Sequence, residues 1–526
     1  MNKRISTLAV LASAAAMIAA APAFAQSGTL RMVPEADVRV LDPTQTTAGM
    51  TLQFAYMIYD NLFAYDSKGV VRPQMVEAHQ VSADGRTYTF TLRPGLKFHD
   101  GTPVKAADAV ASIKRWAAKD LMGKKLLDFG MTLAVSDDQT FTLTLREPFG
   151  LVLDSLGKVA SSGLFIMREK DASSDPNTPI TETVGSGPFT FVKNEWVPGS
   201  KLVFQKNADY VPRSEPADYY AGGRVVKVAR AEWVIIPDAN TGVAALNTGE
   251  VDIHDQPPVT LVDIMRKNKD VTVRAKVPIG NTMFLRPNHL HPPFNDVRVR
   301  RAVMHAVNQE DFMRAGVGDP EFWSVCWAVV PCGNAMSTEA GSDPYKKPDL
   351  ARARALIKEA GAEGASVVVL QPTDLQFLRD FTEVAVQRMR EIGLKVDAQQ
   401  MDWATLVARR VKQDPPAQGG WNMLSTGFSE IELGNLLSNP TLSSACDKSG
   451  WIGWACDAEM EKLRDARSRE ADLGKRRAIA EQIQRRALDQ VQIIPIGVRM
   501  LPIAYRNNIS NILVTPFTVL WNVEKR

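Results

Sequence analysis

Alternation of polar and apolar residues predicts strands in the N-terminal third of the chain. In residues 87–92 three threonines alternate with bulky apolar residues, and residues 140–145 repeat the pattern. A period of two that is rich in aromatic and β-branched residues is typical of strands with one buried face. Between these two segments, residues 105–118 carry their apolar side chains at helical spacing. The N-terminal third is therefore predicted to mix helices and strands.

A strand, a long helix and a second strand are predicted to follow one another in the C-terminal half. Residues 366–370 are a short apolar run, residues 375–392 have one apolar face, and residues 394–396 are mostly apolar again. This order is a βαβ unit, so the two strands are expected to be parallel. Residues 349–360 predict a further helix that is capped by its first residue, Asp349. The C-terminal half is therefore expected to form an α/β lobe of its own.

The first residues have the layout of a secretory signal. Lys3 and Arg4 precede an apolar run over residues 8–21, and residues 23–25 form an A-x-A cleavage site. The run is shorter than the roughly 20 residues that cross a bilayer, so we expect a cleaved signal peptide over residues 1–25 instead of a membrane anchor. No cysteine lies near this site, and no later stretch is apolar enough to span a membrane. We therefore expect a periplasmic protein that is not a lipoprotein.

Length and charge limit the class of protein further. The chain has 526 residues and a net charge of +3, with 62 basic and 59 acidic residues, and removal of Lys3 and Arg4 lowers the net charge to +1. This balance argues against nucleic acid or an acidic membrane surface as the main partner. The length exceeds the roughly 250–300 residues at which a single core stops growing, so at least two domains are expected.

Four cysteines form two local pairs, Cys326 with Cys332 and Cys446 with Cys456, and neither pair has the C-x-x-C spacing of a redox or zinc motif. In an exported chain this favours two small disulfide loops without a catalytic role. Four cysteines formally allow three pairings, and unpaired buried thiols are the alternative.

No enzyme motif is found in the sequence. Residues 185–187 read Gly-Ser-Gly, but they lack the G-x-S-x-G spacing of a nucleophile elbow and run into Pro188, so we interpret them as a turn. Metalloprotease, Walker and dinucleotide-binding motifs are absent. His289 and His291 lie beside Pro292, which favours an exposed loop over a metal site. We therefore expect a protein without enzyme activity, cofactor or metal, although catalytic residues far apart in the sequence would escape this search.

Several segments occur in a characteristic order over nearly the whole mature chain. Residues 82–103, continuing to Val110, combine a hairpin strand, a Pro-Gly turn, a short strand and an Asp-Gly turn before a helix. The other segments are residues 184–189 with Trp196, residues 207–210, residues 245–253, and residues 293–302 continuing to Val307. In this order they resemble the extracytoplasmic solute-binding proteins of family 5, the dipeptide, oligopeptide and nickel type. Each segment alone encodes turns and packing, so the resemblance depends on their order.

The resemblance implies an α/β fold with two lobes. This fold is a large type II periplasmic-binding-protein clamp with an extra subdomain and a ligand cleft between the lobes. Residues 26–285 and 493–526 would form the first lobe, with an inserted subdomain at about 65–183. Residues 286–492 would form the second lobe, and chain crossings near Leu285 and Ile493 would form the hinge.

The resemblance also implies the binding component of an ABC importer. Such a protein captures a peptide or peptide-like polar solute by closing its hinge, and delivers it as a monomer to the permease and ATPase at the inner membrane. Three other interpretations stay open at this point. The solute is an opine, a sugar or a metal chelate, the protein is diverted to sensing or chaperone duty, or it is a secreted hydrolase with a hidden site.

Candidate ligand-binding residues gather in residues 419–432. Peptide binders of the family have a Trp/Gly-rich strand here, followed by an Asp that pairs with the α-amine of the peptide. In this chain no Asp follows Trp421 until Asp447, so Glu430 and Glu432 are the candidate substitutes. The aromatic candidates for the cavity wall are Trp403, Trp421 and Phe428, with core packing as the alternative for each. The weaker candidates are Met50, Asn281, Trp323 and Trp327.

Overall fold

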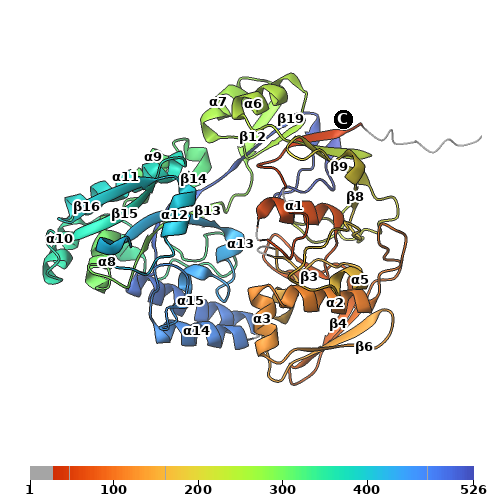
Figure 1. Ribbon diagram of the computed structural model, residues 1–526, viewed down its shortest axis with the longest axis horizontal. Helices are drawn as coiled ribbons and strands as arrows, with labels where there is room; N and C mark the ends of the chain where they lie inside the picture. Colours follow the sequence, from red (N-terminus) through yellow and green to blue (C-terminus); the bar gives the residue numbers. More distant parts are fainter. Residues whose placement is uncertain (1–27, 39, 47, 160–161, 471) are drawn as a thin grey trace, which may run out of the picture.

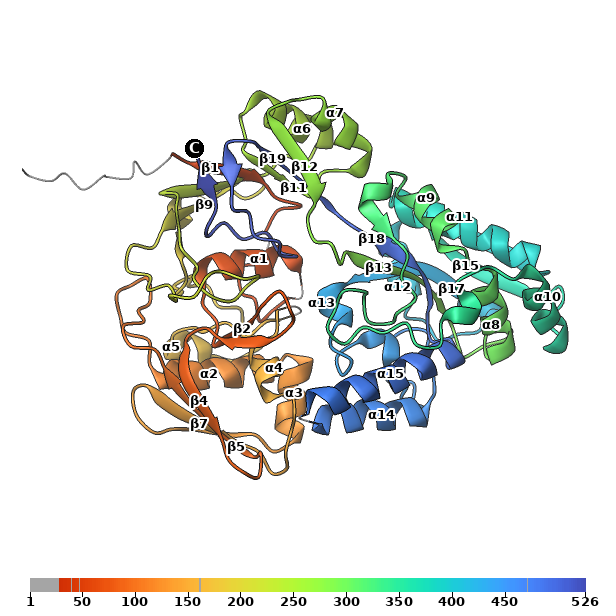
Figure 2. The same ribbon diagram turned by 180° about the vertical axis from the view of Figure 1, so that it is seen from behind.

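The computed structural model describes residues 28–526 except residues 39, 47, 160–161 and 471. The predicted signal peptide, residues 1–25, lies outside this described part. Two lobes lie side by side and are joined by chain crossings along one edge (Figures 1 and 2). Each lobe is built around its own sheet.

The first lobe contains a seven-stranded sheet. Its strands in spatial order are β12 (Val271–Ala275), β19 (Pro502–Arg506), β11 (Ile253–Asp255), β1 (Leu30–Val33), β10 (Arg230–Val234), β9 (Lys201–Lys206) and β8 (Phe189–Phe191). Successive residues of β1 point to opposite faces, so Met32 and Val33 belong to two different apolar cores. One core holds α1 (Gly49–Ile58), and the other holds α6 (Ala239–Thr248) and α7 (Val262–Arg266).

A four-stranded unit extends the first lobe. Its sheet has the order β4 (Val76–Val81), β5 (Thr87–Leu92), β7 (Thr140–Thr144) and β6 (Thr132–Val135). The helices of the unit are α2 (Ala106–Ala117), α3 (Leu121–Asp128), α4 (Val152–Leu156) and α5 (Glu169–Ala172). The two predicted strands and the helix between them are confirmed, and β5 buries every second residue. A short hairpin of β2 (Phe63–Tyr65) and β3 (Val71–Pro73) leads into the unit.

The second lobe contains a six-stranded sheet. Its order is β14 (Trp323–Ser324), β18 (Ile494–Arg499), β13 (Asn281–Pro287), β17 (Met423–Ser429), β15 (Ser366–Pro372) and β16 (Lys395–Met401). The predicted βαβ unit is confirmed, because β15 and β16 pair in parallel and α11 (Gln376–Glu391) connects them. β16 is longer than expected. It is the edge strand and most of its residues are polar, so no apolar pattern marks its end.

The remaining helices of the second lobe surround this sheet (Figure 1). They are α8 (Val297–Ala306), α9 (Gln309–Gly316), α10 (Leu350–Glu359), α12 (Trp403–Arg409), α13 (Glu430–Leu433), α14 (Ala458–Arg469) and α15 (Leu473–Gln490). Asp349 caps α10 as predicted, since its side chain accepts a hydrogen bond from the backbone N–H of Arg352. The C-terminal hairpin of β20 (Ile509–Ser510) and β21 (Glu524–Lys525) belongs to the first lobe.

The chain passes between the two large sheets twice. Residues 276–280 join β12 to β13, and residues 500–501 join β18 to β19. These crossings lie side by side, because the Lys276 N–H donates to the Leu501 carbonyl at 2.7 Å. Leu285 lies within β13 and Ile493 directly precedes β18, so both expected hinge positions fall at or inside the second sheet. Residues 282–288 are all buried, so no change from buried to exposed residues marks Leu285 as a boundary between the two lobes.

Candidate ligand-binding site

A cavity of about 150 Å³ lies at the crossings between the lobes. Asn281, Ser429, Glu430 and Ile431 line it from the second lobe. The other lining residues are Glu35, Gln256, Lys276, Val277, Gly280, Leu501, Pro516 and Phe517. Pockets for drug-sized ligands have volumes of roughly 300–1,000 Å³. The cavity in this conformation therefore accommodates one end of a peptide-sized solute.

The junction of β17 and α13 brings the second-lobe residues to the cavity. Gly427 lets β17 approach β13 closely, since a Cβ atom there would lie 2.4 Å from the Met283 sulfur. The strand ends at Ser429, where α13 begins with a capping box. Glu432 accepts hydrogen bonds from both the backbone N–H and the hydroxyl of Ser429, each at 2.8 Å. Glu432 therefore serves as a helix cap.

Glu430 faces the cavity with a carboxylate that lacks a positive partner. Its Oε1 accepts a hydrogen bond from the Asn334 side chain at 2.8 Å, and no salt bridge to Glu430 is found in the described part of the chain. Burial raises the pKa of Glu430 above its usual value. Burial raises the pKa values of Tyr65 and Tyr219 in the first lobe, and the charge of Glu430 raises both further, so Glu430 acts across the lobe interface.

The opposite wall of the cavity is balanced in charge. Lys276 pairs with Asp255 at 2.7 Å, and both side chains are nearly fully buried. Glu35 accepts a hydrogen bond from the Gln256 side chain at 2.9 Å. Burial and Asp255 raise the pKa of Glu35, while the positive charges of Lys276 and Arg499 lower it. Of the acidic groups around this cavity, Glu430 is therefore the one best placed to attract an ammonium group.

Residues 70–439 match the family model described as bacterial extracellular solute-binding proteins, family 5 Middle. The chain belongs to this family. Two solved structures also share the fold of this family 5 protein. One is the ABC transporter substrate binding protein CtaP from Listeria monocytogenes, with a TM-score of 0.80 and 20% identity, which covers 95% of this chain and 99% of that one. The other is the protein AgaA in complex with agropinic acid, with a TM-score of 0.74 and 23% identity, and it has the same coverage.

Named relatives resemble this family 5 protein over most of its length. One is the probable peptide ABC transporter periplasmic-binding protein y4tO of Sinorhizobium fredii, which is 38% identical over 98% of this chain and 96% of its own. The di/tripeptide-binding protein 1 of Pseudomonas aeruginosa is 26% identical over 96% of this chain and 95% of its own. The glutathione-binding protein GsiB of Salmonella typhimurium is 28% identical over 79% and 77%.

Most of the aromatic candidates contribute to the core of the family 5 protein. Trp421 is fully buried, and its indole N–H donates to the Arg410 carbonyl at 2.9 Å. Trp327 is also buried and stacks on Tyr345. Trp403 lies 5.5 Å beneath the Arg410 guanidinium.

Phe428, Met50 and Trp323 are not among the described residues that line the cavity. Phe428 packs on Phe284 and Trp451, Met50 is buried in α1, and the Trp323 indole donates to the Gly318 carbonyl at 3.2 Å. Among the nine candidates, Asn281 and Glu430 line the cavity.

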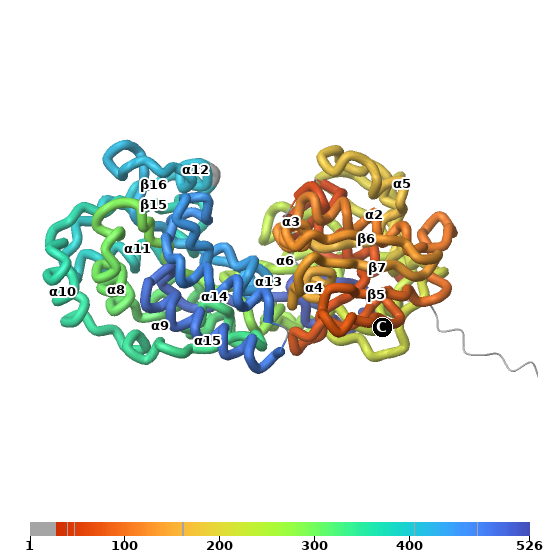
Figure 3. The backbone as a smooth tube through the Cα atoms, turned by 90° about the horizontal axis from the view of Figure 1, so that it is seen from below, coloured from red at the N-terminus to blue at the C-terminus, as the bar shows by residue number. Residues whose placement is uncertain are grey.

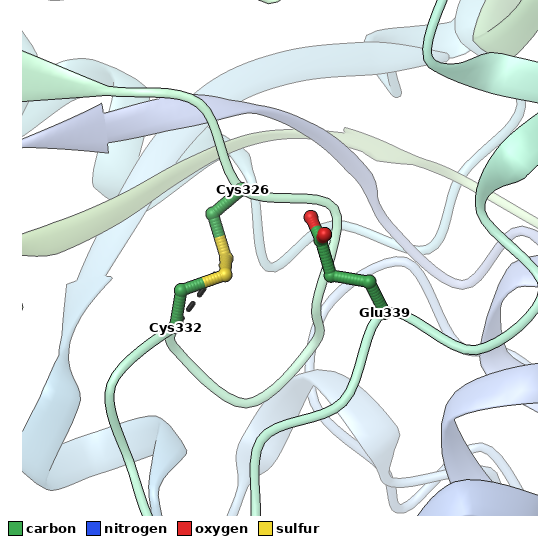
Figure 4. Close-up of side chains that lie close together, drawn as sticks. All are labelled: Cys326, Cys332 and Glu339. Atoms are coloured by element: carbon green, nitrogen blue, oxygen red, sulfur yellow. Dashed lines mark hydrogen bonds between the residues drawn. A yellow bond between two sulfur atoms is a disulfide. The ribbon is translucent and has the colours of Figure 1, made fainter.

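The two local cysteine pairs form the predicted disulfides, Cys326–Cys332 and Cys446–Cys456. Glu339 lies near the first disulfide (Figure 4). Both sulfur atoms are used in the disulfide, and Glu339 accepts a hydrogen bond from the Trp327 N–H at 2.9 Å. The three residues therefore stabilise a loop and do not form a metal site in this oxidised state.

The first-lobe residues of the cavity were not predicted. Glu35, Lys276 and Phe517 lie in three separate segments, and no motif links them. Lys276 belongs to a crossing, but the crossing itself was not located from the sequence, and no sequence signal points to Glu35 or Phe517.

Proposed function

We propose that this protein is the periplasmic binding component of an ABC importer and that it captures a peptide or peptide-like solute between its two lobes. In this proposal residues 1–25 are a cleaved signal peptide and the mature protein is a monomer without lipid attachment. It delivers the solute to a permease and ATPase at the inner membrane and catalyses no reaction. No helix in the described ranges is long and apolar enough to cross a membrane.

Relatives and chain length support the proposal. The relative with 38% identity is named a probable peptide ABC transporter periplasmic-binding protein, and the match covers 98% of this chain and 96% of the relative. Two lobes joined by two short crossings form a clamp, in which a solute that contacts both lobes favours the closed state. The division expected from the resemblance, residues 26–285 with 493–526 and residues 286–492, with a subdomain at about 65–183, is proposed here with its lobe boundaries moved to the crossings, because β13 and β18 belong to the second sheet. The crossings at residues 276–280 and 500–501 would then act as the hinge.

One observation carries the peptide interpretation. Glu430 lines a cavity between the lobes and has an amide, not a cation, as its hydrogen-bond partner. A buried carboxylate is stabilised when a positive group lies beside it. The α-amine of a peptide supplies such a group, so we assign Glu430 as its acceptor.

Binding measurements with a matched pair of variants test this proposal. The protein is purified from its own periplasm, and native mass spectrometry identifies the solute it carries. Peptides are then titrated by calorimetry. Glu430→Gln keeps the acceptor for Asn334 but removes the charge, and we expect it to weaken peptide binding by about tenfold to a hundredfold, the range for a lost charge-assisted hydrogen bond.

Glu432→Gln is the matched control. A glutamine also completes a capping box, so affinity should stay at the wild-type level. N-acetylation of the peptide should weaken wild-type binding as strongly as Glu430→Gln does. Equal affinities for free and acetylated peptides would refute the role of Glu430. If no peptide binds the wild-type protein, the peptide interpretation itself fails.

A further inference from the structure

The two lobes make a second contact far from the crossings, where α14 and α15 meet the four-stranded unit (Figures 1 and 3). Arg476 of α15 pairs with Asp154 of α4 at 3.0 Å. Earlier in both segments, the Gly150 N–H donates to the Ser468 carbonyl at 3.0 Å. Arg469 pairs with Glu147 at 2.5 Å. These contacts hold residues of both lobes in fixed positions around a third arginine.

Two donor atoms of Arg467 are buried at this contact without a hydrogen-bond partner in the described part of the chain. Arg467 is 5% exposed, and neither its Nε nor its Nη1 finds an acceptor among the described residues. Burial and, to a smaller extent, the neighbouring Arg476 lower the pKa of Arg467 to about 10, although Asp154 and Tyr65 act in the opposite direction. The guanidinium therefore remains charged at neutral pH. Arg467 and Arg476 share one carboxylate neighbour, Asp154.

Another buried arginine of the second lobe, Arg286, has the hydrogen bonds to backbone carbonyls that Nε and Nη1 of Arg467 lack among the described residues. Arg286 is fully buried, and its guanidinium donates to the carbonyls of Ile452, Thr441 and Gln492 at 2.6–3.0 Å. A buried charge without hydrogen bonds or a counter-charge is costly, by several kcal/mol per ion. The second lobe thus solvates Arg286 with its own backbone but does not solvate Arg467.

We propose that Arg467 and Arg476 hold a carboxylate between the two lobes. The free donors are Nε and Nη1 of Arg467 and Nε of Arg476. Two guanidinium groups and Asp154 together carry one excess positive charge, which a monoanion neutralises. A phosphate dianion would leave a negative excess beside Asp154. The free donors belong to the second lobe and Asp154 belongs to the first, so the carboxylate would lie at the interface between the lobes.

Acetate binding to the purified protein tests the site itself. Thermal unfolding is followed over a series of acetate concentrations in buffer without chloride, and the midpoints give a dissociation constant. We expect Arg467→Met to weaken acetate binding at least about tenfold, since a hydrogen bond to a charged group is lost. The same variant should unfold at the same or a higher temperature than wild type without acetate, because an unsolvated charge has been replaced by an apolar chain.

The control variant is Arg469→Gln, which removes a guanidinium from the same helix and the same contact. Arg469 is half exposed and already paired with Glu147, so acetate affinity should not change. Equal acetate affinity in Arg467→Met and wild type would overturn the proposal. Stabilisation of wild type by chloride that equals its stabilisation by acetate would also overturn it. Loss of thermal stability in Arg467→Met without acetate would also contradict it, because Arg467 would then be solvated within the protein.

The carboxylate comes either from the imported solute or from a free small acid, and peptides distinguish these sources. If the solute supplies it, which rests on the proposed function, a tripeptide with a free C-terminus binds wild type more tightly than its C-terminal amide. Arg467→Met removes this difference. If acetate binds and the amide binds as well as the free peptide, the site takes a free acid. If acetate binds and no peptide does, the proposed function fails while the anion site stands.

Discussion

Asp42 and Arg115 form a fully buried ion pair that fixes the segment leading into α1. The carboxylate and the guanidinium are 2.9 Å apart, and neither side chain is exposed. Arg115 also donates to the carbonyls of Ser174, Asp175 and Thr178. Asp42 in turn accepts from the backbone N–H groups of Thr44 and Ile180, each at 2.8 Å. Asp42→Asn therefore leaves a charged guanidinium in the core without a counter-charge.

The expected loss follows from this geometry. Removal of one partner of a buried ion pair costs about 3–5 kcal/mol. Asparagine keeps one oxygen acceptor, so we expect the lower end, about 3 kcal/mol, for the unfolding free energy of the first lobe. In a unit of 150–250 residues this lowers the unfolding temperature by roughly 6–12 °C.

Thermal unfolding monitored by tryptophan fluorescence measures the loss, because Trp233 and Trp521 are buried in the first lobe. Glu310→Gln serves as the control. It breaks an exposed pair with Arg314, which is expected to contribute about 0.5 kcal/mol or less. A shift for Asp42→Asn that is no larger than the control shift would refute the reasoning that this buried charge depends on its partner.

Two further predictions concern pH and lobe closure. Burial lowers the pKa of His99 to about 4, and its Nδ1 accepts a hydrogen bond from the Gly185 N–H. Between pH 6.5 and 4 the unfolded chain thus binds more protons than the folded one, so stability falls as pH falls, by roughly 2–3 kcal/mol at pH 4.5 in urea titrations. His99→Gln should lack this component, and an unchanged slope against pH would contradict the assignment. Leu437 of the second lobe packs into the core of the four-stranded unit, so Leu437→Ala should weaken solute binding about tenfold by disfavouring closure. Leu442→Ala, in the core of the second lobe itself, should instead lower the unfolding temperature, and the same loss of stability in both variants would exclude a specific role of Leu437 in closure.

Periodic segments and short loops could be predicted from the sequence. β5, α2, α10 and α11 follow their apolar spacing, and both disulfides close short segments whose ends meet. The edge strand β16 could only be located in part, because both of its faces are largely polar.

The candidate site was less accessible to sequence analysis. Glu430 could be proposed, because it stands where the family has an acidic residue. Lys276 and Phe517 could not, since a cavity wall formed by distant segments has no local pattern. The tryptophans illustrate the opposite error, in which residues proposed for the cavity wall lie in a core. Their size makes them candidates for a cavity wall, but Trp421 and Trp327 gain more by complete burial in a core.

The position of β19 has a consequence for the order in which the lobes fold. This strand lies between β12 and β11 in the seven-stranded sheet, yet it comes from residues 502–506. Until those residues have been released from the ribosome or the export channel, β12 has no neighbour and the first lobe is incomplete. Every strand of the second sheet lies within residues 281–499. The lobe made later can therefore finish folding first, and the lobe begun earlier waits for almost the last residues of the chain.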